Sequence, residues 1–503
     1  MLRTISLSSM LVGLLGAGVV QAQTMDGSTT SNLVKPQESP VVVSGPAAAT
    51  SDEWKFDFHG FFRAPMRIGM AKRENAGLGQ SGLVFHNPRV PDDQYLSWLF
   101  TRNQERDWAE MFFSYGNSRV TGTVSIQGFN FTDAAWNDSD AQFGIAQGFV
   151  TWTPPLGLEG ARLQWRVGSF TERYGMAGKY DAGKYDTYLF GRTHAMGERL
   201  RGEYDLGDVT LKLEHGLGTR QPHPLVSPKN GLTLLHHLHA GVAHKKLLRA
   251  EAHYMTAWSQ DDLATPMQPD GRLTVMGVDV RSELGMFGEI YLGYANVKAR
   301  SAASVGPVIE TVHAYGGGGF GLGVTENYLG PMSNGNGSVN TILFQYDYSI
   351  GLLLRNLRER GAEFYGDGPD ITLSLFGMYN WIASDDAAYD GMKKLKVGAE
   401  AIYTPLPWLG IGARADRLSP DTNDSSQSFS ILSPKLLFRS QFLTHELITL
   451  QYSKYFYGTA YSLETKPPTT VPSAPVAPYG YGAPGITGPP DENVFKIQAT
   501  MWW

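Results

Sequence analysis

The segment KFDFHGFFRAPMRIGM, residues 55–70, carries aromatic and charged side chains at alternate positions. Side chains of an extended strand point alternately to its two faces. Phe61 and Arg63 therefore share a face with Asp57, while phenylalanine, methionine and isoleucine dominate the other face. A ring beside charged groups can hold a sugar, because the C–H face of the sugar stacks on the ring and its hydroxyls form hydrogen bonds with the charges. This face is a candidate binding surface.

The same combination recurs in two other segments. In DWAEMFFSYG, residues 107–116, Trp108 and Glu110 share a face, and in NVFKIQATMWW, residues 493–503, Trp502 lies on the polar face. A large ring that points into water forgoes burial worth about 2 kcal/mol, so these rings need a reason. A line of rings beside charges would form a chain of weak sites, which conduction requires because a solute must leave as well as enter.

Other alternating segments also carry charges on their polar faces. For any single pair we favour the simpler interpretation, in which the charges only solvate a wet channel. The charged set consists of Arg162, Arg166, Glu203, Asp205, Glu214, Asp279, Asp347, Glu400, Arg414 and Asp416.

The stretch TERYGMAGKYDAGKYDTYLFGRTHAMG, residues 171–197, joins two alternating segments and is rich in tyrosine, arginine and aspartate, including Arg173 and Asp181. One interpretation is an ordinary surface loop. Its size and amphipathic chemistry instead favour a loop that folds into a channel as a constriction.

Period-two alternation runs through almost the whole chain from Trp54 onward, without a convincing helix. The 58 glycines and 12% aromatic content also favour strands and turns. We therefore predict an all-β fold. Its eighteen predicted strands lie near residues 54–70, 107–116, 118–131, 143–153, 160–170, 197–206, 208–218, 234–244, 247–258, 272–283, 286–298, 339–353, 371–382, 394–404, 408–418, 428–439, 443–457 and 493–503.

The connections between these segments alternate between short and long. Bacterial outer-membrane barrels have short periplasmic turns and long external loops, whereas a soluble sandwich has no reason to keep this alternation. Unpaired backbone groups facing lipid cost several kcal/mol each, so strands cross a membrane only as a closed barrel. We predict a transmembrane antiparallel β-barrel of about 18 strands over residues 54–503. The connection 354–370 fits least well, and we assign 92–103 to the first external loop.

The chain begins MLRTISLSSMLVGLLGAGVVQAQ, in which Arg3 precedes an apolar core and a small-residue cleavage site at Ala22. Residues 1–22 are therefore predicted to be a signal peptide, which implies export to an outer membrane of Gram-negative type. Residues 23–53, rich in Ser, Thr, Pro and Ala, are predicted to be a flexible periplasmic leader. The chain has no cysteine, so no disulfide is expected.

Several motifs resemble those of the maltoporin, or sugar porin, family. They are FDFHGFFR at 56–63, RNQERDWAEMFF at 102–113, TDAAWND at 132–138, TWTPPLGLEGARLQWRVGSFTER at 151–173 and VFKIQATMWW at 494–503. The likeness is good over roughly the first 150 residues of the barrel and over the last strand, and only architectural between them. It implies a homotrimeric outer-membrane channel in which maltodextrin-like oligosaccharides diffuse along a slide of aromatic rings with a polar track beside it.

The resemblance also implies roles for individual residues. The slide would consist of Phe61, Trp108, Trp136 and Trp502, with Trp136 reaching into the channel of a neighbouring subunit. The polar track would consist of Arg63, Glu110, Arg173 and Asp181. Departures from the family pattern are the leader, the absence of cysteines for a disulfide loop, and Phe61 in place of tyrosine. The solute could therefore be another oligosaccharide, or the selectivity could be broad.

Other functional classes are weaker. We expect no enzyme, because the chain has no Gly-x-Ser-x-Gly or His-Glu-x-x-His motif, and residues 23–53 are too short for the plug of a receptor. In HHLHAGVAH, residues 236–244, His237 and His239 share one strand face and His236 the other. A compact metal site is therefore not forced, and we predict no metal and no cofactor. The net charge of −6 suggests no nucleic-acid partner. The remaining alternative is a general or anion-selective porin without sugar specificity.

Overall fold

The computed structural model describes the strands and parts of their connections. The described residues are 53–72, 83–86, 95–96, 107–129, 142–176, 179–180, 185–186, 191–220, 232–245, 247–260, 270–301, 309–310, 336–351, 369–385, 390–419, 422–425, 428–440, 445–457 and 491–503. The predicted signal peptide, nearly all of the predicted leader and most of 354–370 lie outside them. Within the described residues, no helix is long and apolar enough to cross a membrane.

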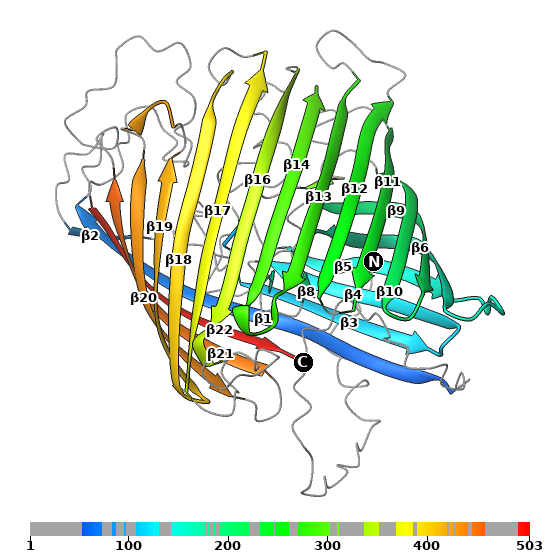
Figure 1. Cartoon of the computed structure of the whole chain (residues 1–503), viewed down its shortest axis with the longest axis horizontal. Coiled ribbons are helices and arrows are strands. Elements are labelled where there is room, and N and C mark those ends of the chain that lie inside the picture. The colour runs from blue at the N-terminus through cyan, green and yellow to red at the C-terminus, as the bar shows by residue number, and fades with distance from the viewer. Residues whose placement is uncertain are drawn as a thin grey trace, which may run out of the picture. The chain divides into compact units, whose positions relative to one another are not determined.

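Eighteen long antiparallel strands form one closed sheet (Figure 1). Each strand pairs with its neighbours in chain order, and β1 (Lys55–Lys72) pairs with β22 (Asp491–Trp502) to close the barrel. Two short strands pair with the ends of long ones. β2 (Leu83–His86) pairs with residues 69–72 of β1, and β15 (Ile309–Glu310) pairs with residues 192–193 of β9. The other long strands are β3 (Trp108–Gly116), β4 (Val120–Phe129), β5 (Gln142–Trp152), β6 (Ala161–Tyr174), β9 (Gly191–Asp205), β10 (Val209–Arg220), β11 (Leu232–His244), β12 (Leu248–Gln260), β13 (Arg272–Glu283), β14 (Glu289–Arg300), β16 (Asn336–Ser349), β17 (Asp370–Ser384), β18 (Lys393–Leu406), β19 (Leu409–Ser419), β20 (Phe429–Ser440) and β21 (His445–Tyr457).

The predicted fold class and strand count are confirmed, and each predicted strand overlaps an observed one. The alternation of short and long connections holds except between β16 and β17, where residues 350–369 stand in the place of a short turn. Backbone hydrogen bonds close the short turns; in one, the Leu206 N–H donates to the Val209 carbonyl at 2.8 Å. Short connections join β3 to β4, β5 to β6, β9 to β10, β11 to β12, β13 to β14 through the 3-10 turn η2 (Gly285–Phe287), β18 to β19, and β20 to β21.

The outer face of the barrel is apolar, as the alternation predicts. Phe56 and Leu213 point outward and expose 65% and 63% of their surface, whereas Phe61 and Glu214 point inward and expose 0% and 1%. Exposed rings also gather beside the short turns. They pair as Trp54 with Tyr115, Trp152 with Trp165, and Trp408 with Phe438. Aromatic girdles of this kind mark the level at which a barrel meets the membrane–water interface.

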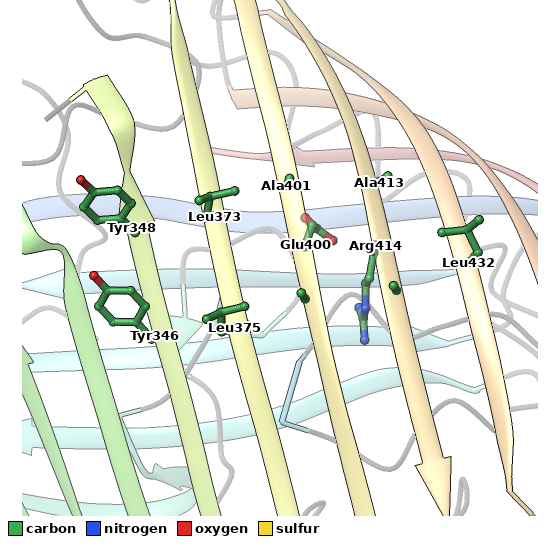
Figure 2. Close-up of a pocket in the computed structure, with 11 residues that line it drawn as sticks. Tyr346, Tyr348, Leu373, Leu375, Glu400, Ala401, Ala413, Arg414 and Leu432 are labelled. Carbon is green, nitrogen blue, oxygen red and sulfur yellow. The ribbon is translucent and has the colours of Figure 1, made fainter. Parts of the chain in front are cut away.

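A shallow groove of about 330 Å³ lies on the outer face of β16–β20 (Figure 2). Its floor is low because two alanine pairs face each other across β18 and β19, Ala399 with Ala415 and Ala401 with Ala413. Leucine and tyrosine side chains rise on either side. Because the groove faces outward, it is no part of a path through the barrel.

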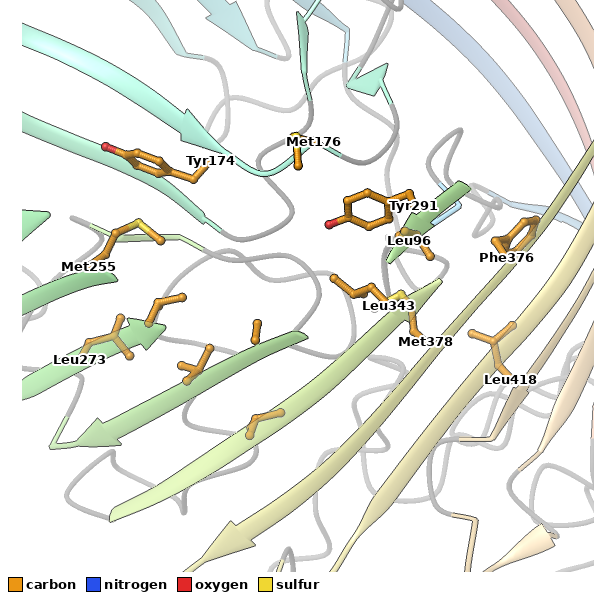
Figure 3. Close-up of a cluster of buried hydrophobic side chains, with 14 of the residues drawn as sticks. Leu96, Tyr174, Met176, Met255, Leu273, Tyr291, Leu343, Phe376, Met378 and Leu418 are labelled. Atoms are coloured by element: carbon orange, nitrogen blue, oxygen red, sulfur yellow. The ribbon is translucent and has the colours of Figure 1, made fainter. Parts of the chain in front are cut away.

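The inner face is layered, which the sequence did not predict. Charged residues occupy the middle of many strands, but apolar side chains dominate the inner face near the long connections of β12–β22. These side chains form one buried cluster, part of which is shown in Figure 3. Leu96 and Met176, from two long connections, belong to this cluster. The sequence predicts aromatic rings and charges on the inner face, and the aliphatic layer that Leu96 and Met176 join is an addition to that prediction.

Gly168 in β6 adopts a backbone φ of +138°, which strongly favours glycine. A Cβ there would contact the Gly148 carbonyl and stand 2.7 Å from the Phe149 Cα on β5. We expect Gly168→Ala to lower the free energy of unfolding by about 1–3 kcal/mol, measured by denaturant titration in detergent. Gly144→Ala is the control, because a Cβ added there would meet no atom within 4 Å; equal losses in both variants would contradict the prediction.

Candidate functional site

Three adjacent strands bring five predicted binding residues together on the inner face. Phe61 on β1 lies opposite Trp502 on β22 and opposite Glu110 on β3, and Arg63 lies opposite Trp108. The Phe61 and Trp108 rings meet edge to face with centroids 4.9 Å apart. The Arg63 guanidinium carbon lies 5.7 Å from the centroid of the Trp108 ring, within cation–π range. Rings, a cation and a carboxylate thus form one patch, which we call the β1 patch.

The β1 patch is covered in this structure. Phe61 and Trp108 expose 0% and 1% of their surface, and Arg63 and Glu110 are buried as well. Trp502 is partly buried against the same apolar cluster. A sugar could therefore stack on these rings only after the covering groups move, and the role of the patch in solute binding stays a prediction.

The other predicted binding residues are not placed to the same degree. Trp136 and Asp181 lie outside the described residues. Arg173 is in β6, where its backbone pairs with Arg192 of β9, but its side chain is outside the described set. The loop that contains Asp181 holds a two-residue ladder between β7 (Lys179–Tyr180) and β8 (Tyr185–Asp186).

The predicted constriction loop starts inside the barrel. Tyr174 and Met176, at the end of β6 and just beyond it, are both buried. The Met176 N–H donates to Asp279 Oδ2 on β13 at 2.7 Å, and the Tyr174 hydroxyl hydrogen-bonds to His237 on β11. The chain therefore bends inward where it leaves β6, as the constriction prediction requires.

The first long connection also enters the barrel, which the sequence pattern did not reveal. The ring of Tyr95 stacks on Phe376 of β17 with centroids 4.5 Å apart, and the Arg414 guanidinium carbon lies 5.2 Å from the Tyr95 ring. Lys396 donates to the Tyr95 carbonyl. Desolvation raises the pKa of the Tyr95 phenol well above its ordinary value, and the Glu400 carboxylate raises it further, so the hydroxyl stays protonated. The only signal in the sequence is the apolar run YLSWLF at 95–100.

A third long connection reaches a strand distant in the sequence. It leaves β14, and its short strand β15 pairs with the end of β9, with Ile309 opposite Thr193. Pieces of three long connections therefore contact strands of the wall.

A buried ion cluster spans β6, β9 and β10. Arg166 and Arg199 lie directly opposite each other, and both donate to Glu172 Oε1 at 2.5 Å. Arg201 donates to Glu214 Oε2 at 2.7 Å. Arg199 and Glu214 each expose 1% of their surface. The two facing cations repel each other, and the Glu172 carboxylate, which both contact, offsets that repulsion.

The opposite part of the wall is rich in cations. Glu400 pairs with Lys435 at 2.7 Å, and Asp416 pairs with Arg414 at 2.9 Å. Cations outnumber carboxylates among the described inward side chains of β18–β22 and β1. The inward cations there include Lys394, Lys396, Arg414, Lys435, Lys496 and Arg63. Within the described side chains, the formal charge of this wall is therefore positive.

Comparisons with known proteins give a likeness of fold only. No family model matches the chain, and no curated protein matches it. The chain is similar to the outer membrane channel DcaP of Acinetobacter baumannii, with 10% identity, a TM-score of 0.41 and coverage of 90% of this chain and 99% of that one. It is also similar to an anion-selective porin from Comamonas acidovorans, with 7% identity, a TM-score of 0.41 and coverage of 90% and 100%.

A third similar structure is OprD of Pseudomonas aeruginosa, with 9% identity, a TM-score of 0.36 and coverage of 91% and 99%. At these identities and TM-scores, the likeness carries no conclusion about solute or assembly. The sugar-porin resemblance, the homotrimer and the exported location therefore stay predictions.

Proposed function

We propose that this chain is an outer-membrane diffusion channel for small hydrophilic solutes. The observation that supports it is a closed sheet with an apolar outer face, exposed rings beside the short turns, and buried charges inside. Soluble monomers rarely expose contiguous apolar patches larger than a few hundred Å². Lipid around the barrel would remove that cost, and closure satisfies the strand backbone within the bilayer.

For the solute, we propose oligosaccharides of the maltodextrin type. The β1 patch supports this choice, because Phe61, Trp108 and Trp502 offer faces for stacking while Arg63 and Glu110 offer hydrogen bonds to hydroxyls. The proposal requires the covering groups to move aside when sugar enters.

The sugar proposal is tested in planar bilayers. Maltooligosaccharides at millimolar concentration are expected to reduce the ion conductance of the wild-type protein. Trp108→Ala should weaken this block by about 1 kcal/mol or more, the scale of one aromatic stacking contact. Trp165→Ala is the matched control, because Trp165 is a tryptophan on the outer face of β6, 40% exposed. If Trp108→Ala is blocked by sugar as strongly as the wild type, the β1 patch does not bind the solute.

An anion channel is the second candidate, and the positive wall on β18–β22 supports it. In that case sugars do not reduce the conductance, and the reversal potential in a salt gradient shows strong preference for anions. Sugar block together with weak ion selectivity would instead exclude the second candidate. Both outcomes come from the same bilayer experiment.

A further inference from the structure

Four side chains on β11, β12 and β13 converge on one point of the inner wall. His239 lies directly opposite His253, and Glu251 lies directly opposite Asp279 on the next strand. Glu251 and His253 are two residues apart on β12 and share its inner face. Two imidazoles and two carboxylates therefore form one compact group, which we call the histidine cluster.

The distances within the histidine cluster suit ligands of one ion. Glu251 Oε2 lies 3.1 Å from His239 Nε2 and 3.9 Å from His253 Nε2, and Asp279 Oδ1 lies 2.9 Å from His253 Nε2. Ligand atoms of His239, Glu251 and His253 all lie within 4.8 Å of one another. Zinc bonds nitrogen and oxygen at about 2.0–2.2 Å in tetrahedral geometry, which sets its ligand atoms roughly 3.3–3.5 Å apart.

We propose that the histidine cluster binds one divalent transition-metal ion such as Zn²⁺. His239, Glu251 and His253 are the ligands, and Asp279 Oδ1 is the neighbouring oxygen donor. Imidazole with carboxylate is a donor set that suits zinc and its neighbours in the first transition row. The two imidazoles stack nearly parallel, with centroids 4.6 Å apart and planes 6° apart. Binding therefore turns one ring about its Cβ–Cγ bond until both lone pairs meet at the ion.

The surrounding hydrogen bonds orient both carboxylates toward the imidazoles. Asp279 Oδ2 accepts from the Met176 N–H at 2.7 Å and from the Tyr291 hydroxyl at 3.4 Å, which leaves Oδ1 facing the cluster. Glu251 Oε1 accepts from Arg249 at 3.4 Å, which leaves Oε2 facing the cluster. Metal sites in proteins generally have such outer hydrogen bonds, because they fix the direction of the ligating oxygen.

The histidine cluster also lies beneath the start of the constriction loop. The Tyr174 ring packs edge-on against His239 and His253, with centroids 6.1 Å and 6.0 Å away. Met176 is tied to the same Asp279. An ion held here would join three strands of the wall at the point where this loop enters the barrel.

Zinc binding is tested by titration calorimetry on the full chain in detergent, without any measurement of transport. We expect one Zn²⁺ per chain, and His253→Ala should weaken binding at least about 100-fold. His236→Ala is the matched control, because His236 lies on the outer face of β11. The zinc affinity of this variant should equal that of the wild type. If the wild type takes up no zinc, or if both variants bind zinc as tightly as the wild type does, the cluster is a hydrogen-bond network and not a metal site.

Two conservative variants keep the test valid if His253→Ala does not fold. Glu251→Gln retains the side-chain volume and should weaken zinc binding, because an amide is a poorer ligand than a carboxylate. Arg249→Gln should weaken it less, because Arg249 is not a ligand and only holds Glu251 Oε1 in place. Visible absorption of bound Co²⁺ reports the geometry, and identical affinities for these two variants would overturn the proposal.

Discussion

Glu172→Gln is expected to lower the free energy of unfolding by about 3–5 kcal/mol, the cost of leaving a buried charge without its partner. The carboxylate of Glu172 accepts from Arg166 and Arg199 at 2.5 Å each. Those two arginines are directly opposite in the register of β6 and β9. Without the carboxylate, the buried guanidinium of Arg199 faces the partly buried guanidinium of Arg166. Among the described side chains, Glu214 is the carboxylate that remains near Arg199, at 4.0 Å.

The loss is measured by denaturant titration of the protein in detergent or lipid vesicles. Asp208→Asn is the control, because Asp208 pairs with Lys245 at 2.9 Å while both are more than half exposed. Exposed pairs contribute about 0–1 kcal/mol, so this variant should stay close to the wild type. In the double variant Arg166→Gln/Glu172→Gln, part of the loss should return, since the facing like charge is gone. A loss below about 1 kcal/mol in Glu172→Gln would mean that the cluster is solvated.

The barrel could be predicted from the sequence because its construction needs only local information. In β19, for example, Ile411 and Arg414 occupy opposite faces by parity alone, and the structure exposes the first and buries the second. The short turns follow from chain length between alternating segments. No contact between distant parts of the chain is needed for either inference.

The layered interior could not be predicted in this way. Parity places Phe376 and Met378 on the inner face of β17, but it does not say what covers them. The stacking of Tyr95 on Phe376 joins a long connection to a distant strand. Such contacts depend on how a connection folds over the wall, and the alternation of apolar residues within a strand does not predict this.

The histidine cluster could not be found from the sequence for a related reason. Within HHLHAGVAH only His239 belongs to it, while His253, Glu251 and Asp279 come from the next two strands. Their convergence depends on the pairing register, which a single strand does not reveal. The prediction of no metal rested on spacing within one strand, whereas the donors are adjacent across strands.

The membrane location of the outer face is tested by placing a charge on it. Leu213→Arg is expected to cost about 2–4 kcal/mol in lipid vesicles if the residue lies near the middle of the bilayer. Leu213 is 63% exposed, and its strand neighbours Lys212 and Glu214 point inward. If water surrounded the barrel, the same substitution at an exposed site would change stability by no more than about 0.5 kcal/mol.

Leu206→Arg is the control for this experiment, because Leu206 is 56% exposed but lies in the short turn between β9 and β10. A charge at the membrane surface should cost only about 0–1 kcal/mol. Both free energies are measured by reversible unfolding from the same vesicles. Because the two leucines have similar exposure, a difference between them reports the depth of lipid and not the loss of a contact. Equal and small effects would show that lipid does not surround the outer face, and the channel proposal would then fail.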